Sequence, residues 1–334
     1  MIQLTESPAA DLHQQRRLPE GGRVPFYARL WRFLRKNGAW LSMCAPSVIL
    51  LFIFSYLPIY GIVIAFKNYK AGRGIWGSEW IGFKNFEFLF TTDTAIRTVR
   101  NTVILNLIFL VTGTIAALLI AFLLYELYGS FLMKFYQSLM FFPNVLSWVI
   151  VSYFVFAFLN TETGLINNAL EKYLAGYKQI LWYQKADAWP WILMIVNLWK
   201  GAGAGSVIYL AGMLAINPEY YESAAIDGAS RWQQRWHITL PLLRPLIMIQ
   251  ILLALRGIFS ADFGLFFFVP NHMNSPQLYA TIDVIDTFVY RSLVKLGNVG
   301  MAAAAGLFQA TVGFVLVMLC NWIIRRIDPD YALF

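Results

Sequence analysis

Residues 102–125 read TVILNLIFLVTGTIAALLIAFLLY, a stretch without a single Asp, Glu, Lys or Arg. About 20 consecutive apolar residues cross the hydrocarbon core of a bilayer as an α-helix, whereas a transmembrane strand needs roughly 9–11 residues of alternating polarity. The stretch is too long for a strand and does not alternate, and irregular backbone leaves its polar groups unsatisfied in lipid. It therefore predicts a membrane-spanning α-helix.

Five more runs have the same character and extend the prediction to the whole chain. They are residues 41–66, 135–160, 188–216, 245–270 and 299–324. Within the six runs the only charged residues are Lys200, Arg256 and Asp262. The composition agrees, because 59% of the 334 residues are hydrophobic and 13% are charged, against roughly 25% charged in soluble domains. The sequence therefore excludes a soluble globular enzyme and predicts an all-α membrane protein with six transmembrane helices in one domain, residues 41–324.

The residues that flank the spans predict the orientation of the chain. Residues 1–40 form a polar segment that ends in a basic cluster, and Arg325 and Arg326 begin a short tail, residues 325–334. An even number of spans puts both termini on one side, and the basic cluster favours the cytoplasm, although the total counts of Lys and Arg on the two sides are nearly equal. The first run has no cleavage site near its end and is expected to be retained. Because these flanks explain the net charge of +8, no nucleic-acid partner is expected.

The connection after the fourth span, residues 217–243, carries the strongest local signals. Asn217 suits a helix N-cap, Pro218 the first helical position and Gly228 a left-handed stop, which together predict a short helix. Ser230 and Gln233 have the spacing of a capping box, so a second helix is expected to follow and to end at Leu240–Pro241. From these residues alone, two interpretations stay open: a surface for another protein, or an amphipathic segment at the membrane interface.

The same connection resembles a family motif. Glu222-Ser223-Ala224, then Gly228 after three residues, then Ile238-Thr239-Leu240-Pro241 after nine more, is similar to the EAA motif of ABC importer permeases, with Ser223 in the usual Ala place. Other stretches resemble the carbohydrate branch of that family and its subgroup for complex oligosaccharides and polysaccharide fragments. They are residues 80–86 (WIGFKNF), 101–102, 262–267 (DFGLFF), 283–291 (DVIDTFVYR) and 330–334 (DYALF).

The resemblance implies a type I ABC importer permease in the bacterial cytoplasmic membrane. Such a subunit pairs with a second homologous permease, two ATPase subunits and an extracytoplasmic solute-binding protein. The implied ATPase-coupling residues are Glu222, Ser223, Ala224, Asp227 and Gly228. The chain has no phosphate-binding Gly-x-x-x-x-Gly-Lys-Ser/Thr run, so it is expected to be non-catalytic and to bind no cofactor, while ATP and Mg bind the partner ATPase subunits.

The polar residues inside the spans are the candidates for contact with a substrate. On a helical wheel of the fifth run, the face that resembles the sugar path of maltose-type permeases is bordered by Arg256. The expected substrate-path residues are Gln250, Leu253, Ala254, Arg256, Gly257 and Asp262. Arg256 is expected to meet either a carboxylated sugar or a group of the partner permease. Lys200 is expected to bind backbone carbonyls or a carboxylate, with substrate as the alternative.

Small residues in the spans are assigned to packing. Close helix approach is expected through Gly201 and Gly205, and Cys44 and Cys320 are interpreted as packing residues rather than metal ligands. No metal site is expected.

Two other classes of function suit a polytopic membrane protein less well. A secondary transporter driven by an ion gradient usually has midplane carboxylates and internal repeats, but Asp262 is the one intramembrane carboxylate of the sequence. An intramembrane hydrolase would need a catalytic motif, and His13, His237 and His272 lie outside the six runs. The resemblance and the cations in the spans together favour an importer of an acidic oligosaccharide such as an alginate fragment. Neutral plant-polymer fragments remain open.

Overall fold

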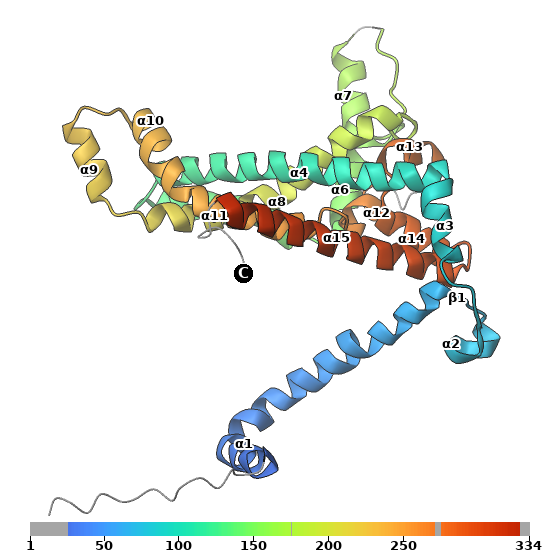
Figure 1. The fold of residues 1–334 in the computed structure, drawn as a ribbon. Coiled ribbons are helices and arrows are strands. Elements are labelled where there is room, and N and C mark those ends of the chain that lie inside the picture. The colour runs from blue at the N-terminus through green and yellow to red at the C-terminus, as the bar shows by residue number, and fades with distance from the viewer. Residues whose placement is uncertain (1–25, 175, 271–274, 328–334) are drawn as a thin grey trace, which may run out of the picture. The chain divides into compact units, whose positions relative to one another are not determined.

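The computed structural model of the chain describes residues 26–174, 176–270 and 275–327, and is almost entirely helical (Figure 1). The chain divides into two compact units, residues 1–60 and 61–334. Within the described residues, five helices are long and apolar enough to cross a membrane, and one bent helix pair brings the number to six if it counts as one span. The predicted all-helical membrane fold is therefore confirmed. The motif-like stretch at 330–334, and most of the predicted N-terminal and C-terminal segments, lie outside the described residues.

The first unit is dominated by helix α1 (Phe26–Leu51), which continues into a π-helical turn, Phe52–Tyr56. A 3₁₀ helix, Leu57–Phe66, begins at the end of this unit. The backbone of α1 kinks at Asn37, with φ −108° and ψ 15°. Cys44 in α1 is exposed within this unit. Large apolar side chains of α1, such as Val48 and Ile49, are also exposed, which suits a helix surrounded by lipid.

The second unit opens with a small polar connection. Strands β1 (Lys67–Asn68) and β2 (Glu79–Trp80) pair antiparallel around helix α2 (Gly74–Gly77), and helix α3 (Lys84–Thr91) follows. The Asn85 side chain donates hydrogen bonds to the carbonyl oxygens of Ala65, at 3.0 Å, and Lys67, at 2.9 Å. These bonds hold the connection against the start of α3.

Three long helices form the body of the second unit: α4 (Asp93–Glu126), α8 (Trp189–Leu214) and α15 (Val299–Ile327). Helices α4 and α8 share a buried cluster that includes Ala117, Tyr209 and Met213. A Cβ on Gly205 would lie 3.2 Å from the Ala117 Cβ, so the predicted packing role of Gly205 is confirmed. The prediction for Gly201 is wrong, because a Cβ there meets no described atom within 4 Å.

The third predicted span is not one straight helix. Helices α5 (Phe131–Val145) and α6 (Trp148–Leu159) are bent by 96° at their junction. Leu146 is extended, and the Ser147 side chain accepts the Ile150 N–H at 3.4 Å as the N-cap of α6. A new helix therefore starts with its own cap inside the charge-free run, which composition does not reveal.

The fifth predicted span, 245–270, is wrong at both ends. The spanning helix runs from Arg231 to Leu255 as α10 (Arg231–Gln234), a π-helical turn (Arg235–Thr239) and α11 (Leu240–Leu255). The helix expected to end at Leu240–Pro241 thus continues into the span. After Leu255 the chain turns, and the Asn106 amide donates to the freed Ile258 carbonyl at 2.9 Å, before α12 (Phe263–Phe268) begins. Such breaks are tolerated where side chains satisfy the backbone.

The remaining helices are short and lie toward the two ends of this unit. Helices α9 (Glu219–Ile226) and α10 mark one end, and α3, α13 (Tyr279–Ile282) and α14 (Ile285–Val294) mark the other (Figure 1). Helix α7 (Leu165–Tyr173) follows α6. A core cluster joins α4, α8, α12 and α13 through fully buried side chains such as Trp189, Phe266 and Ile282.

Candidate functional site

The exposed helix α9 begins and ends at residues that the sequence predicts. The Asn217 side-chain oxygen accepts the Glu219 N–H at 3.1 Å, and the Ser230–Gln233 capping box opens α10. Gly228 has φ +81°, in the region that favours glycine, and the Ala229 N–H donates to the Ala224 carbonyl at 2.9 Å. The predicted short helix with its glycine stop is therefore confirmed.

The motif residues lie together on this helix and its stop. Glu222, Ser223, Asp227 and Gly228 are exposed, and Ala224 is half-buried. Ile226 in the same segment is 87% exposed. The segment thus offers small side chains, the carboxylates of Glu222 and Asp227, and the large apolar side chain of Ile226 to a neighbouring surface.

Helix α9 is fixed to two of the spanning helices. The Tyr221 hydroxyl and the Thr239 hydroxyl are hydrogen-bonded at 2.9 Å, and the Tyr221 ring lies 6.3 Å from that of Tyr125 at the end of α4. Glu126, the last residue of α4, pairs with Arg231 at 2.9 Å and with Arg235. A hollow of about 410 Å³ lies among these groups. A displacement of α9 would therefore also displace the end of α4 and the start of α11.

Two of the predicted substrate-path residues share a groove of about 260 Å³ between α4, α8 and α11. Gln250 and Ala254 line it from α11, and Asn197 adds a polar group from α8. Its floor is open because glycine positions carry no side chain there: Gly113, Gly201 and Gly205. Leu253 is 51% exposed and does not share this lining.

Arg256 lines a different hollow of about 420 Å³, with Ser260, Gln309 and Gly313. The helix ends at Leu255, so the predicted stripe of one helical face does not extend through Gly257. Gly257 instead lies in the turn, where its N–H donates to the Ala254 carbonyl at 2.9 Å. The structure therefore separates the predicted path into a groove on α11 and a hollow beyond its end.

Asp262 caps a helix instead of standing free in a path. Its carboxylate accepts the N–H groups of Gly264, at 2.8 Å, and Leu265, at 3.3 Å, at the start of α12. It also accepts the Trp148 indole N–H at 2.8 Å. Asp262 thus ties the start of α12 to the start of α6, a role that its position in an apolar run does not indicate.

Lys200 binds the broken end of the third span. Its ammonium donates to the carbonyl oxygens of Asn144, at 2.8 Å, and Leu146, at 2.7 Å, and lies 5.1 Å from the Trp148 ring. A cation next to the free carbonyls of a helix C-terminus is favourable. Of the interpretations of Lys200 left open by the sequence, binding to backbone carbonyls is confirmed.

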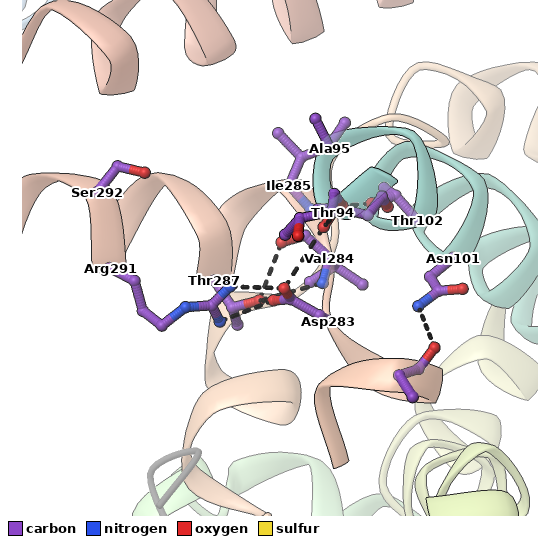
Figure 2. A network of polar contacts seen from close by, with 12 residues as sticks. Thr94, Ala95, Asn101, Thr102, Asp283, Val284, Ile285, Thr287, Arg291 and Ser292 are labelled. Atoms are coloured by element: carbon purple, nitrogen blue, oxygen red, sulfur yellow. Dashed lines mark hydrogen bonds and ion pairs between the residues drawn. The ribbon is translucent and has the colours of Figure 1, made fainter. Parts of the chain in front are cut away.

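A buried polar network at the end opposite α9 was missed by the sequence analysis (Figure 2). Arg291 donates to Asp283 at 2.8 Å, and the Thr287 hydroxyl donates to the same oxygen at 2.8 Å. Asp283 has a fully buried side chain, and its other oxygen accepts from Thr98 of α4 at 3.4 Å. The Thr102 hydroxyl accepts the N–H at the start of α14 at 2.9 Å. The network fastens α14 to α4.

Asp286 lies next to this network and contacts the break of the fifth span. Its carboxylate accepts the Ala261 N–H at 2.7 Å and a Gln309 N–H at 3.3 Å. Burial raises the pKa of the Asp286 carboxyl above its ordinary value, and the two hydrogen bonds oppose that rise. This carboxylate therefore connects the hollow at Gln309 to α14.

Comparisons with known proteins extend this description. Residues 111–329 match the family described as "Binding-protein-dependent transport system inner membrane component". The chain is similar to the polygalacturonan/rhamnogalacturonan transport system permease protein YteP of Bacillus subtilis, at 34% identity over 86% of this chain and 88% of that protein. A solved bacterial ABC transporter involved in the import of the acidic polysaccharide alginate contains a similar chain, with a TM-score of 0.80 and 34% identity, covering 90% of this chain and 99% of that one. A bacterial alginate ABC transporter in complex with an alginate pentasaccharide-bound periplasmic protein gives 0.79 and 34%, over 90% and 98%.

Proposed function

Because the chain belongs to the binding-protein-dependent transport system inner membrane components, we propose that it forms one half of the path of an oligosaccharide importer. It is a multi-pass membrane permease of the carbohydrate ABC type. In this proposal a second homologous permease supplies the other half. The hollow beside Arg256, with Gly306 and Gly313 in its lining, is the surface of this chain that would face the path.

The observation that carries the proposal is the anchoring of α9. An exposed helix whose Tyr221 contacts Tyr125 at the end of α4 and Thr239 just before α11 is suited to receive a movement and pass it on. We assign Glu222 to Gly228 to a groove of an ATPase subunit, two of which serve the importer. ATP and Mg bind those subunits, and closure of the ATPase pair moves α9 and with it α4 and α11. The permease performs no catalysis itself.

The proposed cargo is an acidic oligosaccharide such as an alginate fragment. Similarity to permeases of alginate and polygalacturonan transport systems supports an anionic sugar. The Arg256 side chain in the hollow supports it too, since a guanidinium binds a carboxylate through two parallel hydrogen bonds. An extracytoplasmic solute-binding protein would deliver the sugar at the end marked by α3, α13 and α14. In this arrangement α9 and both termini face the cytoplasm.

A pair of glycine substitutions tests the coupling. Gly228 and Gly129 both have positive φ, +81° and +78°, and neither has a described atom within 4 Å of a Cβ position. Gly228→Val and Gly129→Val therefore introduce similar backbone strain, but only the first lies in the motif. Reconstituted with its partners, the Gly228 variant is expected to lose stimulation of ATP hydrolysis by sugar-loaded binding protein, while the Gly129 variant keeps it.

Full stimulation in the Gly228 variant would contradict the coupling assignment, and equal loss in both variants would attribute the effect to strain alone. Liposomes that contain this chain without ATPase subunits address the alternative function. Sugar flux driven only by a proton or sodium gradient would favour a secondary transporter.

A further inference from the structure

The beginning of α1 has an exposed surface to which the proposed function assigns no role. In the turns before the kink at Asn37, three aromatic side chains are largely exposed: Tyr27 at 73%, Trp31 at 70% and Phe33 at 55%. All the charged residues of the sequence between 26 and 37 are Lys or Arg. An exposed segment of aromatic and basic residues next to a membrane span indicates a binding surface for a neighbouring molecule or for lipid.

The described side chains of this segment separate into two faces. A helix advances by about 100° per residue, so Phe33, Leu34, Tyr27 and Trp31 fall within an arc of about 160°. Arg35 and Lys36 fall in the remaining arc, with Lys36 about 160° from Leu34. The segment is thus amphipathic, with aromatic and aliphatic groups on one face and cations on the other.

The length of the first span places the kink at the membrane surface. The helix that can cross the bilayer, Phe33–Phe66, has 34 residues and is about 50 Å long, whereas the hydrocarbon core is about 30 Å thick. The charge-free run at 41–66 is long enough to fill the core, so the residues before it lie among the headgroups. Asn37, where the backbone leaves helical geometry, stands at this level. A helix that bends there can turn from the span into the plane of the surface.

We propose that residues 26–36 form an interfacial helix that lies along the bilayer surface and binds anionic phospholipids. Its aromatic face enters the boundary between headgroups and acyl chains, where Trp and Tyr are enriched. Arg35 and Lys36 contact the lipid phosphates, and the bend at Asn37 connects this helix to the span. The inference requires only that the first span crosses a membrane, and it does not rest on the coupling or cargo of the importer.

Lipid explains the segment better than a protein groove does. A groove that accepts an amphipathic helix covers its apolar face and has no requirement for a particular distance from the bilayer. Here the segment starts at the level of the headgroups, its apolar face is rich in the aromatic residues of interfacial helices, and its charge is wholly positive.

Spin-label depth measurements on the full chain, assembled with its partners in nanodiscs, test the proposal. Cys44 and Cys320 are first replaced by alanine, and a label is introduced through Leu34→Cys or, as the matched opposite position, Lys36→Cys. Collision with oxygen reports exposure to lipid, and collision with a water-soluble nickel complex reports exposure to water. In nanodiscs with anionic lipid, position 34 is expected to collide mainly with oxygen and position 36 with nickel.

Charge dependence completes the test. Arg35→Gln, combined with each label, is expected to lower the ratio of surface-bound to free segment about fivefold, because each basic residue near an anionic surface contributes about that factor. Purely zwitterionic nanodiscs should have a similar or larger effect. Three results would overturn the proposal: nickel access equal at both positions, protection of both positions from both reagents, which indicates a protein partner, or no response to lipid charge.

Discussion

Replacing Gly203 with alanine is expected to force α5 and α8 apart, whereas the same change at Gly201 is not. A Cβ on Gly203 would lie 1.9 Å from the carbonyl oxygen of Met140 and 2.4 Å from its carbonyl carbon. A Cβ on Gly201 would meet no described atom within 4 Å. The two glycines lie two positions apart on one helix, so the substitutions form a matched pair.

The size of the effect follows from these distances. Carbon and oxygen that are not bonded approach to little less than 3 Å, so the Met140 backbone must move by more than 1 Å, and no side-chain rotation can relieve the contact. Overpacking of this kind costs about 3 kcal/mol. Alanine favours a helix over glycine by about 1 kcal/mol, which offsets part of the cost at Gly203 and stabilises the Gly201 variant. We therefore expect the two variants to differ by about 3 kcal/mol.

Thermal unfolding of the purified importer in detergent measures this difference. At about 2–4 °C per kcal/mol, Gly203→Ala should unfold roughly 6–12 °C below Gly201→Ala. Equal unfolding midpoints of the two variants would refute the predicted steric clash at Gly203. A loss confined to the Gly201 variant would restore the packing role that the sequence predicts for that residue.

Three further predictions concern the charged groups. Arg256→Gln should reduce uptake of an acidic oligosaccharide and spare a neutral one of equal length, and loss of both together with poor assembly would show that Arg256 serves the partner permease instead. Asp283→Asn leaves Arg291, whose side chain is 14% exposed, without its counter-ion and should cost about 3 kcal/mol of stability. Arg231→Gln removes an 82%-exposed partner of Glu126 and should cost less than about 1 kcal/mol, so equal unfolding midpoints of the two variants would contradict this difference. The pKa of Asp286 is raised in the folded state, so the protonated carboxyl contributes to the free energy of unfolding. This contribution is complete below the ordinary aspartate pKa and is lost as pH rises through the raised value. As pH rises between these two pKa values, the unfolding midpoint of Asp286→Asn should therefore increase relative to that of the unchanged protein. A difference between the two midpoints that does not depend on pH would exclude the titration of Asp286.

The helical membrane fold and the form of the α9 segment could be predicted from the sequence because both depend on local signals. A charge-free run of sufficient length has no other stable arrangement in lipid than a helix, whatever its neighbours are. The α9 segment contains its own helix start and stop signals in Asn217, Gly228 and Ser230, which act on backbone groups within a few residues. For this reason the short helix was found at the predicted place.

The breaks inside the third and fifth spans could not be read in the same way. Composition reports whether a run suits lipid, but a break is stable only if distant groups satisfy the freed backbone. Lys200 of α8 does so for the end of α5, and Asn106 of α4 does so beyond Leu255. The predicted bounds of the fifth span also affected the predicted substrate path. Gly257 was predicted on the same helical face as Gln250, with Arg256 at its border, but the helix ends before both residues.

The polar network shows the same division at the level of single residues. The sequence contains Asp283 and Arg291 eight positions apart, a spacing compatible with one face of a helix, but it does not indicate that Thr98 and Thr102 of α4 complete their hydrogen bonds. Likewise, the sequence does not distinguish Gly201, Gly203 and Gly205 of α8, and the approach of α5 is what leaves no room for a methyl group at Gly203 beside Met140. Local chemistry thus determined which segments become helices, and the tertiary structure decided where they break and which residues meet, because hydrogen-bond partners and steric contacts depend on residues far away in the chain.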